Sequence, residues 1–172
     1  QMRFLVVEGL APQLSEEFVD QVADFIGEVA QILNKRILVL FTSHHMLRAV
    51  YERLQLIPLP EVNILAQGIE GSRGSILDEF VKSSKAILLG AYSFWEGIDL
   101  PGDLLSCVIM IKLPFSPPTL PLIEARSELL QQDGKNPFQE LLLPEAVIKF
   151  KQGFGRLIRR KSDKGFIILL DA

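Results

Sequence analysis

The stretch ILVLFTSHHMLRAVYERL, residues 37–54, predicts a strand followed by a helix. ILVLF is a continuous apolar run, as is typical of a strand that is covered on both faces of a sheet. Thr42 and Ser43 come next, and both residue types are favourable just before a helix begins. The helix-like HHMLRAVYERL completes the unit. Units of this kind indicate a parallel sheet that is wrapped by helices.

The same pattern recurs along the rest of the chain. Apolar runs of strand length predict strands at residues 37–41, 62–66, 86–90, 107–113 and 166–170. Helix-like stretches lie at residues 15–33, 44–54, 75–84, 118–131 and 144–160. Strands that alternate with helices predict an α/β fold, with a mostly parallel sheet, helices on both faces and right-handed crossovers.

Length and composition narrow the class of protein. The chain has 172 residues, 48% of them hydrophobic, so length favours a single domain that spans residues 1–172. Lys and Arg number 18 against 21 Asp and Glu, so nucleic acid could be bound only through local groups and not through an overall basic field. Because the chain starts with Gln1 and stops directly after a strand-like run, we expect a fragment of a longer protein.

The single cysteine and the hydropathy pattern indicate the compartment. Cys107 lies inside the apolar run CVIMI, so we expect it in the core, with no intrachain disulfide and no cysteine-clustered metal site. No apolar run approaches the ~20 residues that span a bilayer, and no secretory signal is present. The sequence therefore predicts a cytoplasmic protein without a membrane partner.

The residues that follow the predicted strands are candidates for a site, because ligands gather at the carboxyl ends of parallel strands. Thr42 and Ser43 either cap the next helix or help its first-turn amides to bind a phosphate. His44 and His45 are adjacent and so do not share a helical face, which makes them a poor metal pair. We expect no metal site.

A polar stripe lies on the last predicted helix, in QGFGRLIRR at residues 152–160. At about 100° per residue, Gln152, Arg156 and Arg159 fall within roughly 60° of one another. Gly155 removes a side chain where a large group could approach the backbone. From these residues alone, the stripe is either a solvated basic end of a helix or a working face.

Several motifs in order resemble the second RecA-like motor domain of the DinG and XPD branch of superfamily 2 helicases. They are LVLFTSHHMLRAVYERL, ILAQG, SFWEGIDLPG, IKLPFSPPTLPLIEAR, NPF and QGFGRLIR, and they cover nearly all of the chain from about residue 35. In that family the Thr-Ser segment is motif IV, SFWEGID is motif V and Q-x-x-G-R-x-x-R is motif VI. KLPF, NPF and KQGFGRLIR resemble the bacterial DinG-like group most.

The resemblance implies a shared nucleotide cleft. ATP and Mg²⁺ would be bound mainly by the first RecA-like domain of the same full-length chain, which carries the P-loop. This sequence contains no G-x-x-x-x-G-K-[ST] and cannot build one, so we expect the isolated chain to be inactive. The iron–sulfur cluster of many relatives belongs to the first motor domain and is not expected in this fragment.

Family roles can be assigned to the residues that match motifs V and VI. The resemblance implies that Arg159 is an arginine finger acting on the γ-phosphate, and that Arg156 is a second phosphate or interdomain contact. Glu96 is expected to pair with a motif VI arginine. The residues implied in nucleotide binding are Gln152, Gly97, Asp99, Glu96 and Gly155.

The resemblance also implies single-stranded DNA as a partner. Thr42, Ser43, Gln67 and Ser93 are suited to contacts with successive phosphates, which need local donors more than net positive charge. Trp95 either stacks on a base or packs into the core.

Two other functions stay open at this point. Some DinG-like proteins carry an N-terminal 3′-5′ exonuclease domain, and the helicase region then regulates the exonuclease or presents its substrate. The chain could also be a nucleotide-responsive nucleic-acid-binding module. The preferred hypothesis is the second motor domain of an ATP-dependent DNA helicase.

Overall fold

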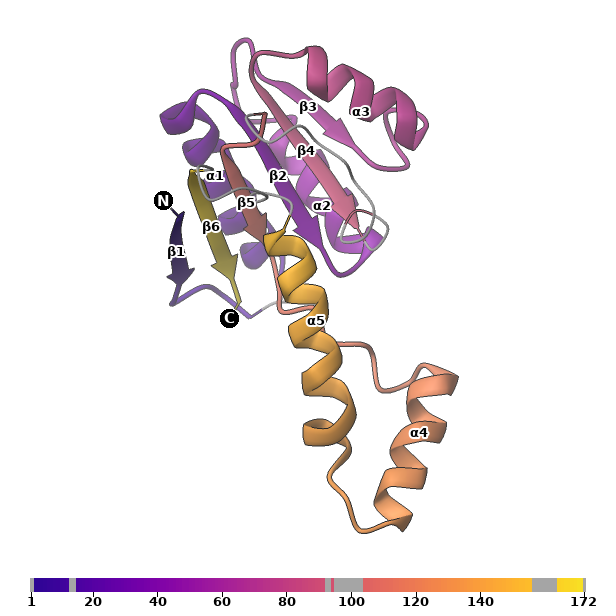
Figure 1. Ribbon diagram of the computed structural model, residues 1–172. Helices are drawn as coiled ribbons and strands as arrows, with labels where there is room; N and C mark the ends of the chain where they lie inside the picture. The colour runs from indigo at the N-terminus through magenta and orange to yellow at the C-terminus, as the bar shows by residue number, and fades with distance from the viewer. Residues whose placement is uncertain (1, 13–14, 92–93, 95–103, 156–163, 172) are drawn as a thin grey trace.

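The computed structural model describes residues 2–12, 15–91, 94, 104–155 and 164–171. These residues form a six-stranded sheet in the order β1-β6-β5-β2-β4-β3, and all of its pairs are parallel (Figure 1). The strands are β1 (Met2–Val7), β2 (Arg36–Phe41), β3 (Asn63–Ala66), β4 (Ala86–Ala91), β5 (Cys107–Met110) and β6 (Gly165–Leu170). The predicted α/β fold is confirmed.

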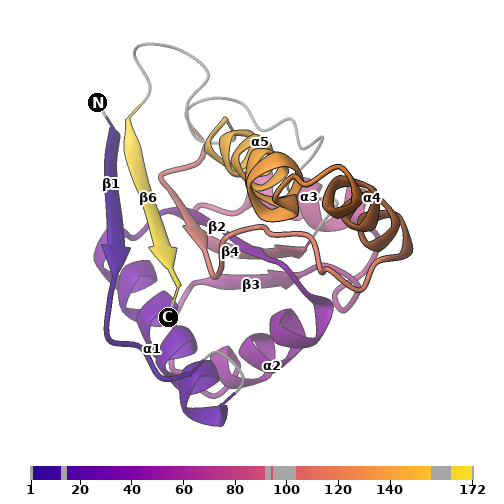
Figure 2. The ribbon, with the colours of Figure 1, turned by 90° about the horizontal axis from the view of Figure 1, so that it is seen from below.

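Helices cover both faces of the sheet. They are α1 (Glu16–Leu33), α2 (His44–Leu54), α3 (Arg73–Lys82), α4 (Pro121–Gln132), the π-helical turn η2 (Phe138–Leu142) and α5 (Leu143–Phe154). Figure 2 shows α1 and α2 on one face and α3 with α5 on the other. The pair α4 and α5 projects beyond the sheet as an arm (Figure 1).

The core has two layers because the side chains of the central strand alternate between the faces. Ile37, Val39 and Phe41 pack with α1 and α2, whereas Leu38 and Leu40 pack with α3. All five side chains are fully buried. This arrangement explains why ILVLF is apolar at every position instead of at every second one.

The crossovers that the structure describes share one hand. Connections through α1 and α2 run toward the β3 edge, and connections through α3 and α5 run back toward β1 on the opposite face. Reversing direction together with face preserves the hand of each crossover, as the right-handed rule for parallel strands requires.

Serine starts three of the helices. The hydroxyl oxygens of Ser15, Ser43 and Ser72 accept hydrogen bonds from the amides of Phe18, Met46 and Ser75, at 3.1, 3.2 and 3.2 Å. Each bond satisfies one of the amides that a helix start leaves without a partner.

Three differences from the predicted elements have physical causes. The edge strand β1 was not predicted, and its side chains Phe4, Leu5 and Val6 remain 43–51% exposed. Strand β5 ends at Met110 instead of residue 113, shortly before Pro114, which has no amide to donate. The last helix was predicted to reach residue 160. Its described part ends at Phe154, and residues 156–160 lie outside the described residues.

Candidate functional site

A cavity of about 430 Å³ opens where the chain leaves neighbouring strands toward opposite faces. Strand β2 leads to α2 on one face, and the adjacent β5 leads through the arm to α5 on the other. Such a switch point at the carboxyl ends of parallel strands is where α/β folds bind ligands. The floor of the cavity includes Phe18, Phe41 and Ile111.

The rim of the cavity carries donors that suit an anion. These donors are on Thr42, Ser43 and Lys112, whereas the hydroxyl of Ser116, which also lines the cavity, is engaged with Lys149 and Glu145. Ser43 caps α2, so the cap interpretation of this residue is confirmed. Because the hydroxyl oxygen accepts from the Met46 amide, its proton can still be donated outward. The first turn of α2 adds the positive end of a helix dipole at the same edge.

Ser116 fixes the base of the arm beside this cavity. It is only 7% exposed, and its hydroxyl accepts a hydrogen bond from Lys149 Nζ at 2.7 Å and donates one to Glu145 Oε2 at 3.4 Å. Arg126 Nη1 lies 3.7 Å from Glu145 Oε1. This chain of contacts ties the loop after β5 to both α4 and α5.

Asp171 closes the next strand end. Its Oδ2 accepts a hydrogen bond from the backbone N–H of Leu113 at 3.1 Å, which joins the exit of β6 to the exit of β5. Asp171, Lys112 and Ser116 were not predicted as site residues from the sequence. A carboxylate directly after a buried strand was the available signal for Asp171.

Gln67 follows β3 and contacts the end of β4. Its backbone N–H donates to Leu89 O at 3.0 Å, and its Oε1 accepts from Ala91 N–H at 2.8 Å. Gly90 has no side chain, and a Cβ there would lie 2.5 Å from Phe94. Gln67 therefore lies at the same carboxyl edge of the sheet as Thr42 and Ser43. The end of β4 lies between them, because β4 is the strand between β3 and β2.

Gln152 and Gly155 lie at the carboxyl end of α5. Gln152 is half-buried, and its Oε1 is buried without a hydrogen-bond partner within the part of the chain that the structure describes. Gly155 is the C-cap residue of α5, with its N–H directed to the carbonyl of Lys151.

The other predicted site residues lie outside the described ranges. They are Ser93, Trp95, Glu96, Gly97, Asp99, Arg156 and Arg159. Their roles stay predictions. Phe94, which lies between two of them in the sequence, is described and is fully buried.

Two negative findings apply to the residues with described positions. No group of three or more His, Cys, Asp or Glu side chains among them could hold a metal ion. None of their helices is both long and apolar enough to cross a bilayer.

Cys107 is fully buried, and burial raises the pKa of its thiol to about 12, in keeping with the predicted core position.

The sheet order, the two helical layers and the site at the carboxyl edge define a RecA-like α/β domain. A solved XPD helicase structure shares this fold with a TM-score of 0.76 and 22% identity, over 99% of this chain and 31% of that one. The family model for the helicase C-terminal domain matches residues 26–172. The chain belongs to this family.

Two curated relatives support the DinG-type resemblance. The chain is 48% identical over 157 residues to the 3′-5′ exonuclease DinG of Bacillus subtilis (strain 168), covering 90% of this chain and 17% of that protein. It is 43% identical over 152 residues to the ATP-dependent DNA helicase YoaA of Escherichia coli (strain K12), covering 88% of this chain and 23% of that protein. The chain thus spans less than a quarter of the length of either relative.

Proposed function

We propose that this chain is the second motor domain of an ATP-dependent DNA helicase, which couples ATP hydrolysis to movement on single-stranded DNA. The observation that carries the proposal is the helicase C-terminal family match over residues 26–172, which includes the sequences SFWEGID and QGFGRLIR. SFWEGID begins two residues after β4 ends, and QGFGR begins within the last turn of α5. The full-length protein supplies the first motor domain.

The residues of this chain fit one wall of a nucleotide cleft. The chain has no P-loop sequence, and its described residues hold no acidic cluster for a metal, so triphosphate and Mg²⁺ would be held by the other domain. Among the residues with described positions, no hydrogen-bond partner reaches the buried Oε1 of Gln152, which supports the proposal that a polar group binds at this end of α5. Arg156 and Arg159 follow on the same helical stripe in the sequence and would direct positive charge toward the phosphates.

Arg159 would act on the reaction as an arginine finger. Charge spreads over the oxygens of the transferred phosphoryl group in the transition state, and a guanidinium stabilises that charge with two parallel hydrogen bonds. Arg156 would hold a phosphate or the facing domain. Glu96, Gly97 and Asp99 would contribute to the nucleotide site and its coupling to DNA.

The rim of the cavity would bind the DNA backbone. Thr42 and Ser43 offer hydroxyl groups at the end of β2, and Ser93 follows β4 in the sequence. Hydroxyl and amide donors bind phosphates without reading bases, so this surface would favour single strands of any sequence.

Removing the three hydroxyls together, as Thr42→Ala, Ser43→Ala and Ser93→Ala, is expected to weaken single-strand binding by the full-length protein by about tenfold or more. The affinity for nucleotide should stay nearly unchanged, because these three hydroxyls are proposed to contact DNA and not the nucleotide. Fluorescence anisotropy with a labelled single strand and a nucleotide-binding titration measure the two affinities.

The matched control is Ser72→Ala, which removes an equivalent helix cap from α3. Loss of a cap alone costs about 0.5–2 kcal/mol of stability, so both variants should show lower thermal stability. If the triple variant loses stability but binds DNA as the wild type does, these hydroxyls are structural and not DNA ligands.

A second candidate function follows from the relative in Bacillus subtilis, whose name is 3′-5′ exonuclease DinG. In a protein of that organisation, this domain would regulate or present the DNA to a nuclease domain. The sequence of the rest of the full-length protein decides between the motor function and this alternative. A complete P-loop in the preceding domain supports a motor, and acidic nuclease motifs without a P-loop support the alternative.

A further inference from the structure

The β3–α3 loop, residues 67–72, is anchored on α2. The Tyr51 hydroxyl donates a hydrogen bond to the Glu70 carboxylate. This bond, followed by burial, raises the pKa of Tyr51 from 10.0 to about 12. Because the folded pKa is raised, the link is complete below pH 10 and is lost as pH rises through about 12. The amides of Ile69 and Glu70 both donate to Ala66 O at 3.2 Å.

The start of the same loop holds the end of β4. In a parallel ladder, one residue bonds to two residues of the partner strand that are two positions apart. Its N–H donates to the carbonyl of the first, and its C=O accepts from the N–H of the second. The backbone N–H of Gln67 donates to Leu89 O, as this pattern requires. The bond from Ala91 N–H, however, goes to the Gln67 side-chain Oε1. The side chain therefore takes the place of a backbone carbonyl and extends the ladder by one step.

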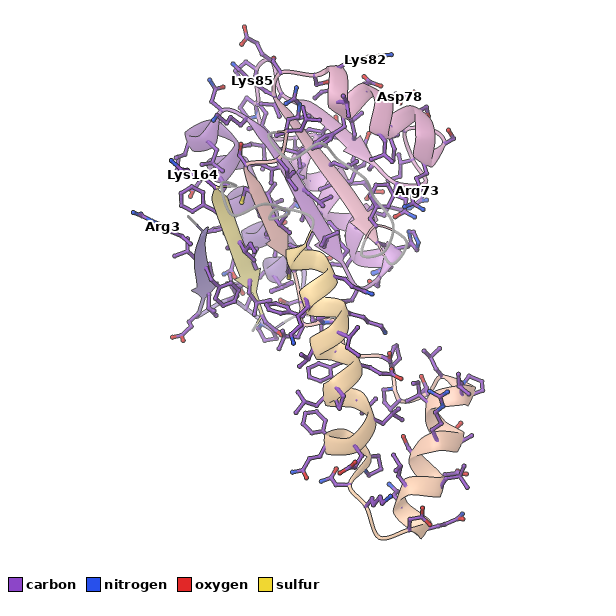
Figure 3. The ribbon with its side chains drawn as sticks, in the orientation of Figure 1. Arg3, Arg73, Asp78, Lys82, Lys85 and Lys164 are labelled. Carbon is purple, nitrogen blue, oxygen red and sulfur yellow. The ribbon has the colours of Figure 1, made fainter. Side chains whose placement is uncertain are left out.

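Phe94 secures the chain just beyond that step. Its side chain is fully buried in the cluster that contains Leu38 and Leu88. Arg73, the first residue of α3, holds its guanidinium carbon 5.4 Å from the centre of the Phe94 ring. Figure 3 shows Arg73 at the end of α3 that is opposite to Lys82. The two ends of the β3–α3 loop thus contact the residues on both sides of Tyr92 and Ser93.

We propose that Gln67 is a positioning residue, which fixes the exit of β4 at Ala91, from where the chain continues into the sequence SFWEGID. The β3–α3 loop, together with Arg73, then links Ala91 and Phe94 to α2, the helix that Ser43 caps. This positioning role differs from the DNA contact that was expected of Gln67. The predicted effect on ATP turnover rests on the proposed motor function, whereas the positioning of the β4 exit does not depend on that function.

Two substitutions of Gln67 separate the two roles. The carboxylate introduced by Gln67→Glu would keep an oxygen that accepts from the Ala91 amide, so this variant should preserve positioning, whereas Gln67→Ala removes it. A phosphate ligand predicts the opposite order, because the negative charge of glutamate repels DNA and alanine only loses a contact.

The single tryptophan of the chain, Trp95, follows Phe94 and reports directly on this segment. In the purified chain, Gln67→Ala is expected to change the emission maximum of Trp95 and its quenching by acrylamide, and Gln67→Glu should restore wild-type values. The matched control is Gln31→Ala, which removes the bond from Gln31 of α1 to Pro58 O and should leave Trp95 unchanged. Far-UV circular dichroism confirms that each variant is folded. Identical Trp95 signals in wild type and Gln67→Ala would overturn the proposal.

The full-length protein provides the second readout. Gln67→Ala is expected to lower kcat for DNA-stimulated ATP hydrolysis by about 10- to 100-fold through misplaced groups, with KM for ATP little changed, and Gln67→Glu should recover most of kcat. Weaker single-strand binding by Gln67→Glu than by Gln67→Ala would identify a DNA ligand and overturn positioning. If the wild type hydrolyses no ATP while the Trp95 comparison holds, the motor function fails and the positioning role stands.

Discussion

Replacing Arg159 by alanine in the full-length protein is expected to slow ATP hydrolysis by about 10³- to 10⁵-fold. The affinity for ATP should change much less, because an arginine finger acts mainly on charge that develops in the transition state. Steady-state hydrolysis and equilibrium nucleotide binding, measured on the same preparation, separate the two effects. Arg159→Lys should recover little, since an ammonium lacks the planar fork that holds two oxygens.

The neighbouring Arg160→Ala provides a matched control, because it removes the same charge about 100° around the same predicted helical stretch. It should retain most of the activity. Equal losses of ATP affinity and of turnover in Arg159→Ala would make Arg159 a ground-state contact and not a finger.

A large loss of stability is expected from substitution of Phe94. Phe94→Ala removes a fully buried ring from the layer that contains Leu38, Leu88 and Val108, and should cost about 3–5 kcal/mol. The cavity cannot be filled easily, because Gly90 beneath the ring has no side chain. Chemical denaturation of the isolated chain measures the loss.

Phe138→Ala is the control for this substitution. Phe138 is 49% exposed and stacks on Phe115 with ring centres 5.6 Å apart, so its removal should cost only about 1 kcal/mol. Similar losses for the two variants would show that the Phe94 side chain does not secure the exit of β4.

The strands could be predicted where burial is complete. Runs such as ILVLF and AILLG are covered on both faces, and a continuous apolar pattern expresses that directly. Strand β1 was missed because it lies at an edge and depends on pairing with β6, at the other end of the chain. The sequence pattern carries no signal for such a pairing.

The candidate site was predictable only in part. Thr42 and Ser43 were found because strand ends and helix caps have local signatures. The bonds of Gln67 to Ala91, of Ser116 to Lys149 and of Asp171 to Leu113 join residues that are distant in the sequence. They arise when the sheet brings strand ends together, which only the assembled fold shows. The helical spacing showed Arg156 and Arg159 on one polar stripe, and the family resemblance supplied the roles predicted for them.

The most direct test of the account is ATP hydrolysis with and without single-stranded DNA, by the full-length protein and by the isolated chain. The account predicts that single strands raise the rate of the full-length protein, and that the isolated chain releases no phosphate at a motor-like rate, because it lacks a P-loop sequence. Two results would contradict the assignment as a second motor domain. One is a full-length protein whose ATP hydrolysis is not stimulated by DNA. The other is an isolated chain that hydrolyses ATP as fast as an intact motor and loses this activity with Arg159→Ala.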